Sequence, residues 1–252
     1  MKKQIDLSIT NYGTVKDLKY EIVLLPWGAT EPHNYHLPYL TDSILSHAIA
    51  VDAAETVLQN YNVRCMVMPP VNFGSQNPGQ KELPFCIHTR QSTQQAILED
   101  IVSSLYVQGI RKMLIINGHG GNNFKGMIRD LSQTYPDFLI FTTEWYTVVP
   151  AKEHFEAEID DHAGETETSV MMYYYPELVN LSEAGSGNST EFAIEFLNKK
   201  IAWTPRNWQK ISKDTGVGNP TKATAEKGKD FAEIIVDKLT KLLSEIGTKD
   251  LY

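Results

Sequence analysis

Short apolar runs alternate with amphipathic segments along most of this chain. Four runs bounded by turn residues predict buried strands, at Glu21–Leu25, Arg64–Val67, Lys112–Ile116 and Phe138–Phe141. Apolar residues at helical spacing predict helices at Ser43–Leu58, Gln91–Val107, Asn123–Thr134, Glu165–Tyr175 and Thr190–Asn198, and a long amphipathic helix from Phe231 to Ile246. Strands that alternate with helices imply βαβ units, so the pattern predicts an α/β fold with a mostly parallel sheet covered on both faces.

Chain length adds the domain organisation. A chain of 252 residues suits one α/β domain with a sizeable core, or two small ones. Since no internal repeat, low-complexity tract or linker divides the sequence, we expect a single domain spanning residues 1–252. In open α/β sheets, ligands bind beyond the carboxyl ends of the strands. The loops that follow the predicted strands are therefore where functional residues are expected.

Composition and charge narrow the range of partners. The net charge of -8 argues against nucleic acid, because phosphate binding needs a basic surface. No segment approaches the roughly 20 apolar residues of a membrane span, and the start lacks the apolar stretch of a signal peptide. We therefore expect a soluble, cytoplasmic protein without membrane contact. Cys65 and Cys86 are expected to be small buried apolar residues rather than a disulfide.

Candidate metal ligands follow the first and third predicted strands. Glu31 and His33 lie in the first of these loops, Asp42 precedes the next helix, and His119 lies in Asn117-Gly-His-Gly-Gly-Asn122. Taken singly, Asp42 suits a helix N-cap and the others suit solvated loops. These interpretations do not explain why the residues are grouped at one edge of the sheet. Carboxylates and imidazoles suit Zn²⁺, Mn²⁺ or Fe²⁺, so the group predicts a metal site.

The glycine-rich loop has a second interpretation. Glycines after a strand can cradle a phosphate at a helix N-terminus, but this spacing matches neither a P-loop nor a dinucleotide fingerprint. We favour His119 as a metal ligand, with the backbone amides of Gly120 and Gly121 donating to a substrate or a developing oxyanion. Aromatic residues such as Trp27, Trp145 and Tyr146 are expected to pack rather than to line the site.

A third cluster, His162-Ala-Gly-Glu165-Thr-Glu167-Thr-Ser169, leads into a predicted helix. Its glutamates suit the first turn of a helix on electrostatic grounds alone. His162 is the candidate general acid or base, since its unperturbed pKa of roughly 6.5 lies near working pH. Two ions about 3.5–4 Å apart and bridged by an aspartate would polarise a carbonyl and lower the pKa of a shared water towards about 7, for attack on an amide.

These motifs resemble the creatininase (creatinine amidohydrolase) family. The resemblance rests on Leu25-Pro-Trp-Gly-Ala-Thr-Glu31-Pro-His33, His36-Leu-Pro, Thr41-Asp42, the Asn117–Asn122 loop, the His162–Ser169 cluster and the Gly216-Val-Gly-Asn-Pro220 turn. It implies a three-layer α/β/α sandwich, two divalent metal ions, hydrolysis of C–N bonds in small cyclic or formyl amides, and a homo-oligomer, often a hexamer. By motif, Glu31, Asp42 and His119 would hold one ion. His33 and the bridging Asp42 would hold the other, and His162 would transfer protons.

The sequence departs from the family pattern after His119. Creatininases have an aromatic residue and a ligating glutamate there, where this chain has Gly120 and Gly121. We expect the missing carboxylate to come from Glu167 rather than Glu165, and we count Glu167 with His162 among the catalytic candidates.

The loop from Ser75 to His88 also departs from the family, as do Pro32 and Asn34 beside His33. This loop is expected to shape the substrate pocket, and Ser75 is a candidate substrate-binding residue. The sequence thus predicts a metal-dependent amidohydrolase acting on a small cyclic amide, a formamide or a peptide-like substrate. The alternatives are a metal-stabilised binding or scaffold protein without turnover, and a phosphate or nucleotide binder.

Overall fold

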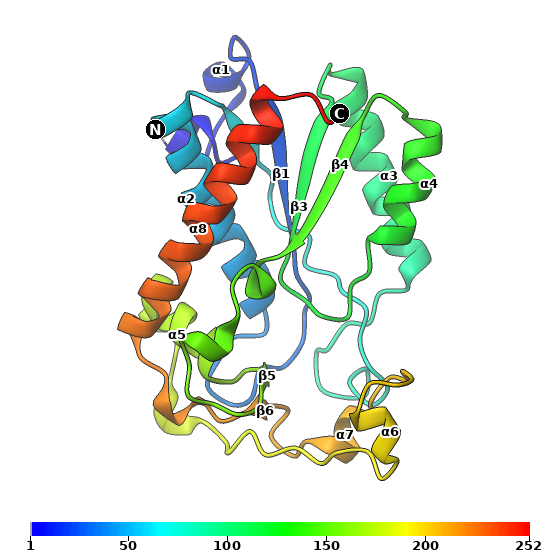
Figure 1. The fold of residues 1–252 in the computed structure, drawn as a ribbon, viewed down its shortest axis with the longest axis vertical. Helices are drawn as coiled ribbons and strands as arrows, with labels where there is room; N and C mark the ends of the chain where they lie inside the picture. The colour runs from blue at the N-terminus through cyan, green and yellow to red at the C-terminus, as the bar shows by residue number, and fades with distance from the viewer. Residues whose placement is uncertain (1) are drawn as a thin grey trace.

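A four-stranded parallel sheet lies at the centre of the structure, a computed structural model that describes residues 2–252 (Figure 1). Its strand order is β2-β1-β3-β4. The strands are β1 (Ile22–Trp27), β2 (Cys65–Val67), β3 (Lys112–Asn117) and β4 (Leu139–Glu144). Every neighbouring pair is parallel, which confirms the sheet predicted from the alternating pattern.

Helices cover both faces of the sheet, as Figure 1 shows. One face packs on α2 (Thr41–Tyr61), α5 (Glu165–Tyr174) and α8 (Ala225–Thr248), and the other on α3 (Gln91–Val107) and α4 (Lys125–Thr134). Alternate residues of β1 enter the two cores: Ile22 and Leu24 enter the first, and Val23 and Leu25 the second. The three-layer α/β/α sandwich is confirmed.

Short elements complete the fold. They are the helices α1 (Tyr12–Val15), α6 (Glu195–Asn198) and α7 (Trp208–Ile211) and the 3₁₀ turns Lys2–Gln4, Trp145–Thr147, Ala151–Glu153, Pro176–Leu178, Leu181–Glu183 and Pro220–Lys222. A second sheet, not predicted from the sequence, pairs β5 (Asp160–His162) antiparallel with β6 (Val217–Gly218). Cys65 and Cys86 are buried and free, as expected. Among the described residues, no helix has the length and apolarity to cross a membrane.

The helix predicted over Thr190–Asn198 is wrong in extent, because only Glu195–Asn198 is helical. The Asn198 side chain accepts a hydrogen bond from the Phe192 amide (3.1 Å) and donates one to the Phe192 carbonyl (2.8 Å). These bonds close a loop and replace helical ones. Ile194 and Phe196 are more than half exposed, so no buried apolar face stabilises a longer helix here.

Candidate metal centre

The carboxyl edge of the sheet brings the predicted ligands together. β1 leads into the loop with Glu31 and His33, β3 leads into the loop with His119, and α2 begins beside both. Gly118 permits this approach, because a Cβ there would lie 2.4 Å from the Asp42 carbonyl oxygen. The N-cap of α2 is Leu40, so Asp42 is not the N-cap that its position suggests. Its carboxylate faces the two loops instead.

Asp42 lies between two histidines and uses a different oxygen for each. Its Oδ1 is 2.9 Å from Nε2 of His33, and its Oδ2 is 3.2 Å from Nδ1 of His119. The same His119 nitrogen is 2.7 Å from Oε1 of Glu31. All four side chains are buried, with at most 6% of each residue exposed. Asp42 thus has the geometry of a carboxylate that bridges two positions.

Each histidine of the site uses its second ring nitrogen on a backbone carbonyl. Nδ1 of His33 is 3.0 Å from the Glu31 carbonyl, Nε2 of His119 is 2.8 Å from that of Ser75, and Nε2 of His162 is 3.0 Å from that of Pro32. In the neutral form that would bind a cation, a ring whose N–H donates to a carbonyl has a lone pair on its other nitrogen. In all three histidines this other nitrogen faces a buried carboxylate. Acceptors that converge in this way fit a site for cations.

Three overlapping groups of side chains have ligand atoms within 4.8 Å of one another, as a metal ion requires. The groups are Glu31, Asp42 and His119; His33, Asp42 and Glu167; and Glu31, His33 and His162. The first two share Asp42 and match the two ligand sets expected from the resemblance, with Glu167 in place of the missing glutamate.

Glu165 lies elsewhere. One of its oxygens contacts Nζ of Lys227 on α8 at 2.6 Å, and the other accepts from the amides of Glu156 and Ala157, both at 2.9 Å. Its carboxylate is fully committed to holding the segment before β5 and α8 against α5. Of the two glutamates considered, the geometry brings Glu167 to the cluster.

Burial and mutual charge shift the pKa of several groups. Burial alone would lower the pKa of His33, but the charges of Asp42, Glu167 and Glu31 overcome it and raise the pKa to about 10. Burial raises the pKa of Glu167 to about 8. For His162, burial and the neighbouring His33 both lower the pKa, so its imidazole is neutral at pH 7. The cluster thus holds protons at His33 and Glu167 that a cation would displace.

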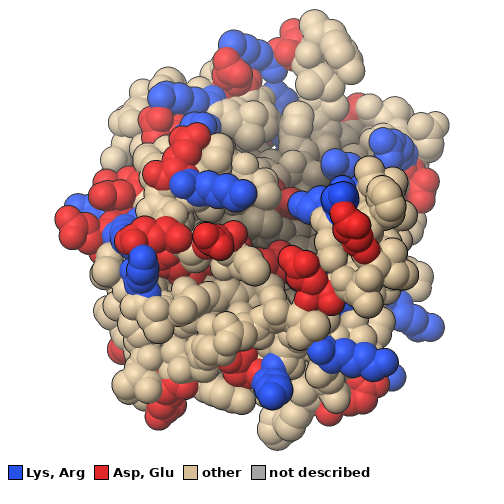
Figure 2. Space-filling view, turned by 60° about the horizontal axis from the view of Figure 1, so that its bottom comes forward, with Lys and Arg blue, Asp and Glu red and all other residues tan. Residues whose placement is uncertain are grey.

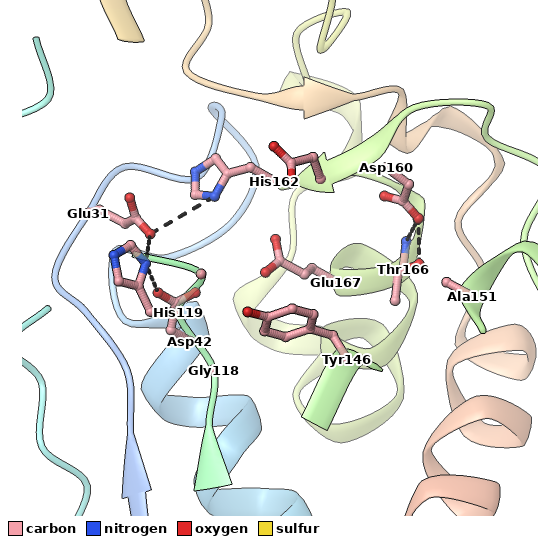
Figure 3. A pocket seen from close by; sticks show the side chains of 12 residues that line it. Glu31, Asp42, Gly118, His119, Tyr146, Ala151, Asp160, His162, Thr166 and Glu167 are labelled. Carbon is pink, nitrogen blue, oxygen red and sulfur yellow. Dashed lines mark hydrogen bonds and ion pairs between the residues drawn. The ribbon is translucent and has the colours of Figure 1, made fainter. Parts of the chain in front are cut away.

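A cavity of about 120 Å³ opens beside the cluster (Figure 3). Its lining includes Glu31, Asp42, His119, His162 and Glu167, which point into one space, and it also includes Gly120, Tyr146, Asp160 and Asp161. On this face, acidic and basic side chains are interspersed around a hollow (Figure 2). Carboxylates dominate the cavity, which disfavours a phosphate in the glycine loop, and α4 begins only at Lys125.

Gly121 and Ser75, predicted to bind substrate, lie outside the lining of this cavity. Their backbones contact His119 instead. The Ser75 carbonyl accepts from His119, and a Cβ on Gly121 would lie 2.0 Å from that carbonyl oxygen and 2.5 Å from Nε2 of His119. The close approach requires glycine, so this residue supports the position of the histidine. Gly120, by contrast, lines the cavity as expected.

Gly121→Ala is therefore expected to weaken metal binding at least about tenfold, as loss of a partner behind a ligating histidine does. Titration of the metal-free protein with Zn²⁺ measures the change. Gly120→Ala is the matched control, because its Cβ would meet Tyr146 Oη at 3.5 Å, an ordinary contact. Equal affinities for the two variants would contradict the role given to Gly121.

Sequence reasoning missed two contributors to the site. Tyr146 lines the cavity, whereas Trp27 and Trp145 are fully buried in the core as expected. The available signal for Tyr146 was its position just after β4, at the same edge of the sheet. Gln80 donates to Oε2 of Glu31, and nothing in its sequence context indicates this contact.

Comparison with known proteins bears on the family and the fold. The family model described as Creatininase, creatinine amidohydrolase, matches residues 7–243. One similar structure is the crystal structure of a Bacteroides fragilis NCTC 9343 protein whose name contains creatinine amidohydrolase. It superposes on this chain with a TM-score of 0.99 and is 67% identical over 100% of both chains. The mycofactocin precursor peptide peptidase of Mycobacterium ulcerans (strain Agy99) is 28% identical over 87% of this chain and 84% of its own. A mutant creatininase of Zn-Zn type shares the fold, with a TM-score of 0.77 and 21% identity over 96% of this chain and 98% of its own.

Proposed function

The chain belongs to the creatininase family of hydrolases, and from this premise we propose that it uses two divalent cations to cleave the C–N bond of a small amide. The observation that supports this most is the position of Asp42, whose two oxygens face one ring nitrogen each of His33 and His119. A carboxylate that binds one metal ion, or that has only a structural role, would not need to direct both oxygens in this way.

The residues present fit two cations. Glu31, Asp42 and His119 would hold one, and His33, Asp42 and Glu167 the other. These oxygen and nitrogen donors, without a thiolate, suit Zn²⁺, Mn²⁺ or Fe²⁺. When bound, such ions polarise a carbonyl and lower the pKa of a water towards about 7.

His162 is the proposed proton-transfer residue. Its Nε2 donates to Pro32, so the lone pair on Nδ1 faces the cluster, 4.0 Å from Oε1 of Glu31. Trp208 packs edge-on against the ring, with centroids 5.2 Å apart, which fixes its orientation. A neutral imidazole in this place can take a proton from a water and return it to the leaving nitrogen. Glu167, beside it in the lining, is the second candidate for proton transfer.

Two groups are placed to orient the substrate. The Tyr146 phenol reaches within 3.5 Å of the Cβ position of Gly120, at the cavity wall. Burial and nearby carboxylates raise its pKa, so the phenol stays protonated and can donate a hydrogen bond. The backbone amide of Gly120 is a second donor to a substrate oxygen.

The substrate is proposed to be a small cyclic amide, a formamide, or the end of a peptide-like molecule. A cavity of about 120 Å³ admits only a small group. A relative is named as a peptide peptidase, which supports keeping a peptide end among the candidates. The loop that includes Ser75 and Gln80 shapes one side of the site, through Ser75 on His119 and Gln80 on Glu31.

Removal and return of metal tests the proposal. Treatment with a chelator should abolish hydrolysis of the active member of a panel of cyclic ureas, lactams, formamides and short peptides. Zn²⁺, Mn²⁺ or Fe²⁺ should then restore it, with two ions bound per chain. Full activity without bound metal would contradict the proposal. Two bound ions without turnover of any panel member would favour the metal-stabilised binding or scaffold protein.

A homo-oligomer, a hexamer by resemblance, stays a prediction for the assembly, and the expected cytoplasmic location also stays a prediction. Large apolar side chains at Phe196, Ile201 and Trp203 are exposed on the segment around α6, which supports an assembly that covers them. Light scattering on the purified protein measures its mass in solution.

A further inference from the structure

Gln80 is a buried amide that contacts a proposed ligand. It is 1% exposed, and its Nε2 donates to Oε2 of Glu31 at 2.5 Å. Its Oε1 accepts from the amide of Asn77 at 2.8 Å. Because the Asn77 amide is a donor, the carboxamide can satisfy both partners in only one orientation. The donor end is thereby fixed on Glu31.

The contact leaves the other oxygen of Glu31 for the metal site. Oε2 receives the amide hydrogen of Gln80, while Oε1 lies 2.7 Å from Nδ1 of His119 and 4.0 Å from Nδ1 of His162. Without a donor on Oε2, the buried carboxylate can rotate about its last torsion, which is broad for glutamate. Oε2 of Glu31 would also be buried without a hydrogen-bond partner.

The turn that presents Gln80 is itself held in place. Gly79 has a φ of +88°, and the amide of Trp208 donates to the Pro78 carbonyl at 2.7 Å. The Gln209 side chain donates to the Gly79 carbonyl at 2.8 Å. Trp208 also packs on His162. The start of α7 therefore contacts both the turn that carries Gln80 and the proposed proton-transfer residue. Such a fixed support is what a precise ligand position requires.

We propose that Gln80 is a positioning residue, which holds Glu31 so that Oε1 is directed to the cation shared with His119 and Asp42. This inference rests on the proposed function for the presence of that cation. The ligand itself is Glu31, and Gln80 acts through it.

Zinc titration of the metal-free Gln80→Leu variant tests this proposal without a substrate. Loss of a hydrogen bond behind a metal ligand typically costs about 10- to 100-fold in affinity, so one of the two ions should bind that much more weakly. The ion held by His33, Asp42 and Glu167 should change less. Gln94→Leu is the matched control: Gln94 is fully buried on α3, donates to the Thr89 carbonyl, and belongs neither to the groups of convergent ligands nor to the cavity lining.

Gln80→Glu separates positioning from packing. It has the same shape and can still accept from Asn77, so a packing role would make it the milder change. A positioning role makes it the more damaging one, because a carboxylate would face Glu31. It also provides a second variant if Gln80→Leu does not fold, as judged by circular dichroism.

Wild-type zinc affinity in both Gln80 variants would overturn the proposal, as would an equal loss in Gln94→Leu. A wild-type protein that binds two zinc ions but hydrolyses nothing would contradict the proposed reaction. The zinc titration of the Gln80 variants would still test the role of Gln80. A wild-type protein that binds none of Zn²⁺, Mn²⁺ and Fe²⁺ would contradict both.

Discussion

Asp42→Ala is expected to remove both metal ions and to lower kcat/KM at least about 1,000-fold, since metal ions contribute several kcal/mol of transition-state stabilisation. Oδ1 and Oδ2 of Asp42 face His33 and His119, respectively, so one substitution removes a ligand from each proposed position. The remaining sets, Glu31 with His119 and His33 with Glu167, have two ligands each. Metal analysis after dialysis and activity on the panel substrate measure the result.

Asp52→Ala provides the control for this variant. Asp52 lies on the same helix, α2, beside Tyr173 and Tyr174 in a hollow separate from the metal centre. Its loss should leave metal content and activity unchanged. If Asp42→Ala retained two ions and full activity, the shared-carboxylate geometry would have no functional meaning and the proposed reaction would be wrong.

The sequence predicted the sheet because β1, β2 and β3 are short apolar runs buried on both faces, and the edge strand β4 begins with one. The prediction for α3 agrees at both ends. At its C-terminal end, Gly109 follows the helix with a φ of +88°, a conformation that favours glycine. The edge rule for parallel sheets then placed Glu31 and His119 in neighbouring loops before any distance was known. Local pattern and topology were sufficient for these features.

Other features depend on long-range contacts that no local pattern encodes. The strand β5 is a polar three-residue segment, Asp-Asp-His, which is extended only because it pairs with Val217–Gly218 far along the chain. Gln80 reaches Glu31 across 49 residues. Glu165 and Glu167 both suit a first helical turn, and residues two apart point in different directions on a helix. Only the position of Lys227 on α8 shows which glutamate faces away from the cluster.

His162→Ala is expected to lower kcat about 100- to 10,000-fold, the usual contribution of a general acid or base, while both metal ions remain bound. Burial and His33 lower the pKa of His162 below 6.5, so its neutral form is present above that pH and is lost on acidification. The wild-type rate should therefore fall on the acid side below about pH 6.5, the reference value for histidine. This acid limb should be absent from the variant, and added imidazole should restore part of the rate.

Metal content decides between two roles for this histidine. His162 also shares a group of convergent ligand atoms with Glu31 and His33, but its Nδ1 is 4.0 Å from Glu31, against 2.7 Å for His119. A proton-transfer residue can be removed without loss of an ion, whereas a ligand cannot. If His162→Ala bound one ion fewer and imidazole restored that ion, His162 would be a ligand. The proton would then have to pass through Glu167, the second candidate for proton transfer in the cavity lining.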